Sequence, residues 1–128
     1  MLNFFYIAAG GALGAVARYS VSGWVQNLGP ATFPWGTLCV NTTGSLLIGL
    51  FLGISELTPV PSPARLLFAV GFLGAFTTFS TYSLETLNLF RDKEATLGLM
   101  NIGLNNSLSL VAVCGAYFLS RSIITLIK

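Results

Sequence analysis

The chain has 128 residues, of which 54% are hydrophobic and only 8% are charged. Soluble domains carry roughly 25% charged residues, and six basic with four acidic side chains cannot cover a soluble surface of this size. The mean hydropathy of +0.80 agrees, so the expected environment is a lipid bilayer. The formal net charge of +2 comes from scattered side chains, which argues against a nucleic-acid partner.

Histidine is absent, which removes the commonest metal ligand and the usual proton shuttle. The two cysteines, Cys39 and Cys114, each lie in an apolar run and are interpreted as small hydrophobic residues. These absences argue against an enzyme. The first basic residue is Arg18, so the N-terminus lacks the basic start of a secretory signal. We therefore expect the opening segment to be a transmembrane helix.

Four apolar segments are long enough to cross a bilayer, which takes about 20 residues. Turn signals separate them: Gly29-Pro30 before the second, three prolines within residues 56–63 before the third, and a charged cluster at 91–94 before the fourth. The sequence predicts an all-α, multi-pass membrane protein formed by a single domain over residues 1–128. Its helices are expected at about 2–25, 35–55, 64–90 and 95–127.

Small residues recur at helical spacing in the first two segments, as Gly10-Gly11 with Gly14 and as Gly49 with Gly53. Such patterns let helix backbones approach closely, and we expect packing from them and no ion chemistry. Arg18 lies late in the first segment and is always charged. Either it reaches the membrane interface or it adds positive potential to an anion pathway.

Neutral polar side chains recur every four residues along the second and fourth segments, so each set shares one helix face. Polar groups are costly in lipid, and these stripes indicate either a hydrophilic pathway or hydrogen bonds between helices. We favour a pathway, and its amide and hydroxyl donors suit an anion better than a cation. The stripes are Thr37, Asn41 and Ser45, and Asn101, Asn105 and Ser109.

The third segment contains two glycines and a dense run of hydroxyl residues within residues 71–83. Glycine and β-branched threonine disfavour a continuous helix, so a break is expected there. A break frees backbone carbonyls, which a bound cation could satisfy. Phe79 and Tyr82 share a face of this run, either as packing residues or with their electropositive ring edges toward an anion. Glu85, the candidate titratable group, lies late in the segment.

Lysine and arginine are balanced between the two sides of the predicted bundle. An excess of lysine and arginine on one side normally sets the orientation of a membrane protein. A balance of three against three therefore gives no preferred direction of insertion. The chain is then able to insert both ways, and two copies could meet antiparallel. The basic residues are Arg65, Arg121 and Lys128 on the side of the termini, and Arg18, Arg91 and Lys93 on the other.

With these motifs the sequence resembles the Fluc family of fluoride channels, also called CrcB. The resemblance covers essentially the whole chain and rests on Gly-Ala-Val-Ala-Arg at 14–18, Pro-Trp-Gly-Thr-Leu-Cys-Val-Asn at 34–41, and the Gly-Phe-Leu-Gly to Leu-Glu run at 71–85. It implies a passive fluoride channel of the cell inner membrane that exports fluoride and protects against its toxicity. It also implies an antiparallel, dual-topology homodimer with two pores and a central sodium ion.

The resemblance also implies residue roles. Sodium would be held by the main-chain carbonyls of Gly74 and Thr77. Tyr82 stands where the family often has phenylalanine, and Asn105 where many relatives carry serine. The fluoride pathway, including residues of both polar stripes, is expected to contain Asn41, Phe79, Tyr82, Thr37, Thr81, Ser83, Glu85, Asn105, Ser109 and the vestibule residue Arg18.

Two rival functions fit a small helical membrane protein. A proton-coupled small multidrug transporter also has four short helices, but it needs a carboxylate near the midplane, and the first segment has none. A purely structural membrane subunit would explain the glycines and leave the polar stripes unexplained. No phosphate-binding GxxxxGK[ST] motif is present, which agrees with passive transport.

Overall fold

The computed structural model describes residues 1–127, and these residues form helices and connecting turns with no strand. Lys128, which entered the charge balance, lies outside the described residues. Four helical segments are long and apolar enough to cross a membrane, so the prediction of a four-helix, multi-pass membrane protein is confirmed. They are Leu2–Gln26, Trp35–Leu57, Ser62–Arg91 and Ala95–Ile127.

The first two spans are α1 (Leu2–Gln26) and α2 (Trp35–Leu57). The loop between them is fixed by the side chain of Gln26. Its Nε2 donates to the Phe33 carbonyl at 3.0 Å, and its Oε1 accepts from the Gly36 N–H at 3.2 Å. This side chain gives an acceptor to the Gly36 N–H, one of the first N–H groups of α2, which have no partner within their own helix.

The third span is made of several helical pieces, and the fourth is a single helix, α6 (Ala95–Ile127). Between them the chain turns through Lys93, a residue with positive φ. The pieces of the third span are α3 (Ser62–Arg65), the π-helix η1 (Leu66–Leu73), α4 (Gly74–Phe76) and α5 (Phe79–Arg91).

Two residues between α4 and α5 have extended backbone conformations. Thr77 has φ −82° and ψ 154°, and Thr78 has φ −149° and ψ 112°. Both are β-branched, a shape that fits extended backbone well. The Thr78 side chain accepts from the N–H of Thr81 at 3.3 Å and so caps the start of α5.

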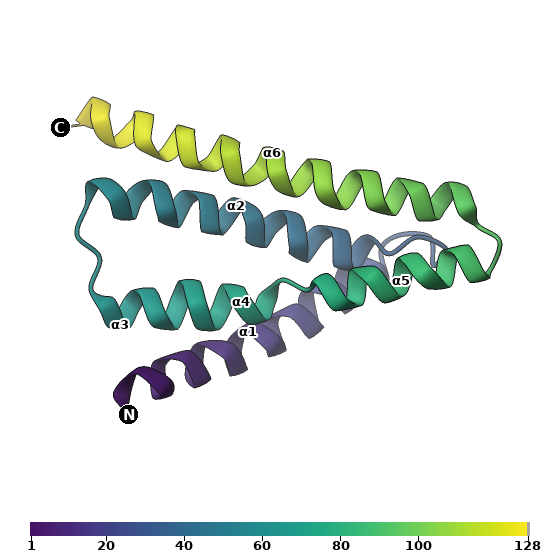
Figure 1. Ribbon diagram of the computed structural model, residues 1–128, viewed down its shortest axis with the longest axis horizontal. Coiled ribbons are helices and arrows are strands. Elements are labelled where there is room, and N and C mark those ends of the chain that lie inside the picture. Colours follow the sequence, from purple (N-terminus) through teal and green to yellow (C-terminus); the bar gives the residue numbers. More distant parts are fainter. Residues whose placement is uncertain (128) are drawn as a thin grey trace.

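The spans pack in two close pairs (Figure 1). α2 lies along α6, and α1 crosses the third span beside α4, with both termini at one end of the bundle. Glycines permit this approach, as predicted. A Cβ at Gly10 would overlap the Leu67 carbonyl, and one at Gly49 would overlap the Val113 carbonyl.

Large apolar side chains cover the outside of the bundle, and few lie inside it. Val40 is fully buried, and Leu73 and Phe76 are nearly so. This arrangement suits a chain surrounded by lipid, where exposed apolar surface has no cost. The exposed set includes Phe4, Leu13, Val16, Leu110, Val111 and Phe118.

Candidate ion pathway

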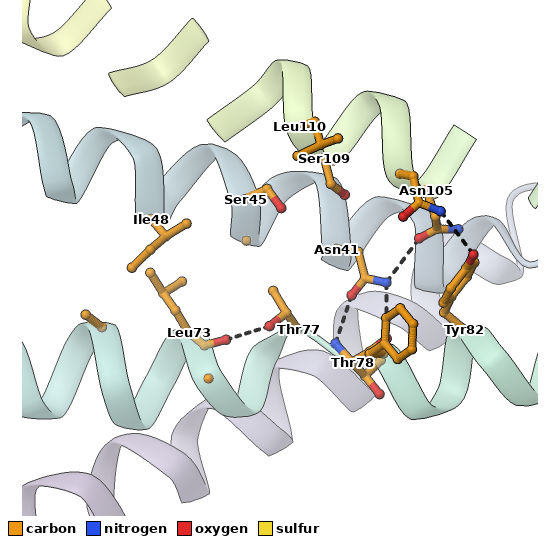
Figure 2. Close-up of a pocket in the computed structure, with 15 residues that line it drawn as sticks. Asn41, Ser45, Ile48, Leu73, Thr77, Thr78, Tyr82, Asn105, Ser109 and Leu110 are labelled. Carbon is orange, nitrogen blue, oxygen red and sulfur yellow. Dashed lines mark hydrogen bonds between the residues drawn. The ribbon is translucent and has the colours of Figure 1, made fainter. Parts of the chain in front are cut away.

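A cavity of about 430 Å³ lies between α2, the third span and α6, at the level of the two extended threonines (Figure 2). Its lining mixes apolar side chains with amides and hydroxyls, and no charged residue belongs to it. The polar members are Asn41, Ser45, Thr77, Thr78, Tyr82, Asn105, Asn106 and Ser109.

Asn41 forms hydrogen bonds with both backbone polar groups of Thr78. Its Oδ1 accepts from the Thr78 N–H at 2.8 Å, and its Nδ2 donates to the Thr78 carbonyl at 3.1 Å. The same Nδ2 donates to Asn105 Oδ1 at 3.0 Å, so both amide hydrogens have acceptors. In this arrangement Asn41 fixes the extended segment between α4 and α5 (Figure 2).

The carbonyls of Gly74 and Thr77 lose their usual helical donors here. In a continuous α-helix they would accept from the N–H groups four residues later. Those groups belong to Thr78 and Thr81, which instead donate to Asn41 and to the Thr78 hydroxyl. Gly74 is exposed, and the position of a Cβ on it has no neighbour within 4 Å. These two oxygens, also expected from the family resemblance, therefore fit a hard cation such as sodium.

A chain of hydrogen bonds runs from Asn41 along α6. Asn105 accepts from Asn41 and donates to Asn101 Oδ1 at 2.7 Å. Asn101 is fully buried and donates to the Thr86 hydroxyl at 2.9 Å, which itself donates to the Tyr82 carbonyl at 2.8 Å. Each amide accepts on one side and donates on the other, so the network is satisfied inside the membrane.

The two aromatic residues predicted for the pathway occupy different environments. Their ring centroids are 5.2 Å apart and the planes are inclined by 58°. Tyr82 is buried, whereas Phe79 is 75% exposed on the surface of the single chain. The Tyr82 hydroxyl also accepts a hydrogen bond from Asn106 on α6.

Thr37 and Glu85 form a pair outside the cavity lining. The Thr37 hydroxyl donates to Glu85 Oε1 at 2.8 Å, and Thr37 is 2% exposed. The second carboxylate oxygen, Oε2, is buried and has no hydrogen-bond partner among residues 1–127. One oxygen of this carboxylate is therefore placed for a further donor.

The remaining predicted residues do not reach the cavity. Thr81 accepts from the Thr78 hydroxyl at 2.9 Å, and Ser83 donates back to the Phe79 carbonyl at 2.8 Å, both on exposed faces of α5. Arg18 is half-buried on α1 and forms no ion pair within the described part of the chain.

The structure divides the two polar stripes between lining and helix contacts. Four of the six residues line the cavity: Asn41, Ser45, Asn105 and Ser109. The other two, Thr37 and Asn101, form hydrogen bonds between helices.

Sequence reasoning assigned no role to Thr78 or Asn106. Both were recognisable as polar residues inside a span, and Thr78 has the residue type of a helix N-cap.

Comparison with known proteins identifies the family. A family model described as "CrcB-like protein, Camphor Resistance (CrcB)" matches residues 5–117. A Hahella chejuensis protein named "Fluoride-specific ion channel FluC" is 47% identical over 123 residues, covering 95% of this chain and 97% of the relative. A Maridesulfovibrio salexigens protein of the same name is 42% identical over 126 residues, covering 98% and 100%. The chain therefore belongs to the CrcB family.

Proposed function

We propose that this chain is a passive, fluoride-selective channel that exports fluoride from the cytoplasm and protects the cell against it. The observation that carries the proposal is a cavity between the spans of a four-helix membrane protein, whose lining places neutral hydrogen-bonding side chains among apolar ones. Amide, hydroxyl and backbone N–H groups are the donors that a small anion requires. The relatives named fluoride-specific ion channels point to fluoride as that anion and to a transporter, not an enzyme.

The proposed direction of transport follows from acid–base chemistry. Hydrogen fluoride crosses membranes as a neutral molecule and dissociates in the more alkaline cytoplasm, which traps the anion. A negative-inside potential then drives the anion outward through a passive pathway, with about 2.3 kcal/mol per charge per 100 mV. The proposed location is accordingly the cell inner membrane.

Selectivity requires replacement of fluoride's strong hydration by fixed donors. In this proposal the polar lining supplies them together with the edges of Phe79 and Tyr82. Asn41 contributes chiefly by holding the extended segment, because both of its amide hydrogens are already bonded. Thr37, Thr81, Ser83, Glu85 and Arg18, which lie outside the cavity lining, would act along the approach to it.

The proposed assembly is an antiparallel homodimer of dual topology with two pores. Two features of the single chain support it. Phe79 is largely exposed although the neighbouring ring of Tyr82 is buried, and Gly74 presents its backbone on an open face. A second copy would cover both. A sodium ion held by the carbonyls of Gly74 and Thr77 would offset their partial negative charge at that interface.

The lining also weighs against the two rival functions. A proton-coupled drug transporter needs a carboxylate in its central site, and the cavity residues include none. A purely structural subunit needs no polar cavity in the membrane, where unpaired polar groups are costly.

The test is fluoride efflux from liposomes containing the purified protein, read with a fluoride electrode and started with a potassium ionophore. Rapid efflux that is independent of a pH gradient, with chloride retained, is the expected result. Folded protein that passes no fluoride would overturn the proposal, and efflux that requires a proton gradient would favour a coupled carrier.

A further inference from the structure

The contact between Tyr82 and Asn106 excludes the tyrosine hydroxyl hydrogen from the side that faces Asn106. Asn106 Nδ2 lies 2.7 Å from the Ile102 carbonyl oxygen and 3.1 Å from Tyr82 Oη. A carbonyl oxygen only accepts, so the Asn106 atom facing it must be the amide nitrogen. The same nitrogen faces Tyr82, and the phenol oxygen is therefore the acceptor of that bond.

A hydroxyl that accepts on one side has its own hydrogen free for another acceptor. Tyr82 forms no hydrogen bond through that hydrogen to any residue in the range 1–127. The side chain is only 7% exposed and belongs to the cavity lining. An O–H group without an acceptor is unfavourable in a membrane interior, so this position suits an acceptor that enters the cavity.

We infer that the Tyr82 hydroxyl donates a hydrogen bond to the permeating anion, and that Asn106 is the positioning residue that keeps the hydroxyl hydrogen turned into the cavity. This inference rests on the proposed channel function. It adds an O–H donor to the ring edges of Phe79 and Tyr82. Fluoride accepts hydrogen bonds more strongly than chloride does, so such a donor favours fluoride.

The simpler interpretation is that the Tyr82–Asn106 bond only ties α5 to α6. It predicts that removal of the hydroxyl affects stability without affecting transport. The two interpretations are separable because Tyr82→Phe keeps the ring, its packing and its contact with Phe79, and removes only the oxygen. Tyr19→Phe is a matched control, since Tyr19 lies on α1 and is 84% exposed.

The experiment measures fluoride and chloride efflux from liposomes containing the full-length wild type, Tyr82→Phe, Asn106→Leu, the double variant and Tyr19→Phe. Loss of one neutral hydrogen bond is expected to lower fluoride efflux roughly three- to tenfold in Tyr82→Phe, with no change in Tyr19→Phe. Asn106→Leu should lower efflux in the wild-type background. It should have no further effect when Tyr82 is already phenylalanine, because it acts through the hydroxyl.

The outcomes separate this inference from the proposed function. A wild type that passes no fluoride overturns the channel function itself. A wild type that conducts while Tyr82→Phe conducts equally well overturns the hydroxyl donor and leaves the channel standing. Equal losses from Asn106→Leu in both backgrounds overturn the positioning role. If Tyr82→Phe does not fold, Asn106→Leu alone decides, since unchanged efflux in that variant contradicts the inference.

Discussion

The Asn41 side chain on α2 forms hydrogen bonds with both the N–H and the carbonyl of Thr78. The extended segment of the third span is therefore held by a side chain from a neighbouring helix. The Thr78 N–H donates to Asn41 and not to the Gly74 carbonyl, which is one of the candidate cation ligands. The Asn41 amide therefore contacts the cavity and also determines which donors remain for that carbonyl.

Replacing Asn41 should destabilise the protein and stop transport. Asn41→Ala leaves the N–H of the buried Thr78 without its acceptor, at about 1–3 kcal/mol for the unsatisfied group. The expected result is a lower melting temperature in detergent, followed by circular dichroism, and loss of fluoride efflux. Asn88→Ala, at an exposed site on α5, is the control and should match the wild type. A stable, fully conducting Asn41→Ala protein would contradict the role assigned to this amide.

Truncation of Phe79 should affect transport far more than folding. The side chain is 75% exposed in the single chain, so Phe79→Ala removes little buried area within it. We expect the helical content of the wild type by circular dichroism and fluoride efflux reduced about tenfold, as for the loss of one stabilising donor. Phe4→Ala is matched in exposure, at 77%, and should conduct normally. Equal efflux from the two variants would remove Phe79 from the pathway.

The close packing of α1 on η1 predicts opposite effects for two glycines of the same helix. Gly10→Ala places a methyl group against the Leu67 carbonyl and should cost about 1–3 kcal/mol. Gly23→Ala meets no atom within 4 Å and should gain up to about 1 kcal/mol from helix propensity. Thermal unfolding in one detergent compares them directly. A Gly10→Ala protein as stable as Gly23→Ala would contradict the described helix contact.

The Thr37–Glu85 hydrogen bond predicts coupling between two spans. Thr37→Val removes the donor to the carboxyl group and should cost about 1 kcal/mol. In a Glu85→Ala background the same change should cost clearly less, because the acceptor is gone. Thr96→Val, at an exposed position, serves as the control. Additive losses in the double variant would show that the two side chains do not interact.

Sodium at the carbonyls of Gly74 and Thr77 should stabilise the folded protein. A ligand present at 100 times its dissociation constant adds about 2.7 kcal/mol, so exchange of sodium for choline should lower the melting temperature. Asn41→Ala should reduce this sodium dependence, because Asn41 holds the extended segment that presents the two carbonyls. Melting curves that do not respond to the cation would argue against the site.

Composition and periodicity were sufficient to predict the four spans and the glycine contacts, because apolar length and small-residue spacing act locally. The cavity-facing members of the stripes, such as Asn41 and Ser109, followed from the same periodicity. Asn101 shares that spacing and is nevertheless buried against Thr86. Which helix supplies a partner depends on how the helices rotate against one another, and one sequence does not specify that rotation.

The part played by Thr78 could not be predicted for a related reason. Its neighbours Thr77 and Thr81 are also threonines, and all three are plausible ends of a helix. The choice is made by Asn41, which lies 37 residues earlier and pairs with only one of them. Asn106 was missed because its partner, the Tyr82 hydroxyl, lies on another span.

The interruption at Thr77 and Thr78 gives the third span two additional helix ends within the membrane. A helix carries a partial positive charge at its first N–H groups and a partial negative charge at its last carbonyls. α4 therefore ends with its negative pole, and α5 begins with its positive pole, with two residues between them. Electrostatic attraction for an anion and for a cation thus arises from the backbone itself, and no side-chain substitution that preserves the interruption removes it.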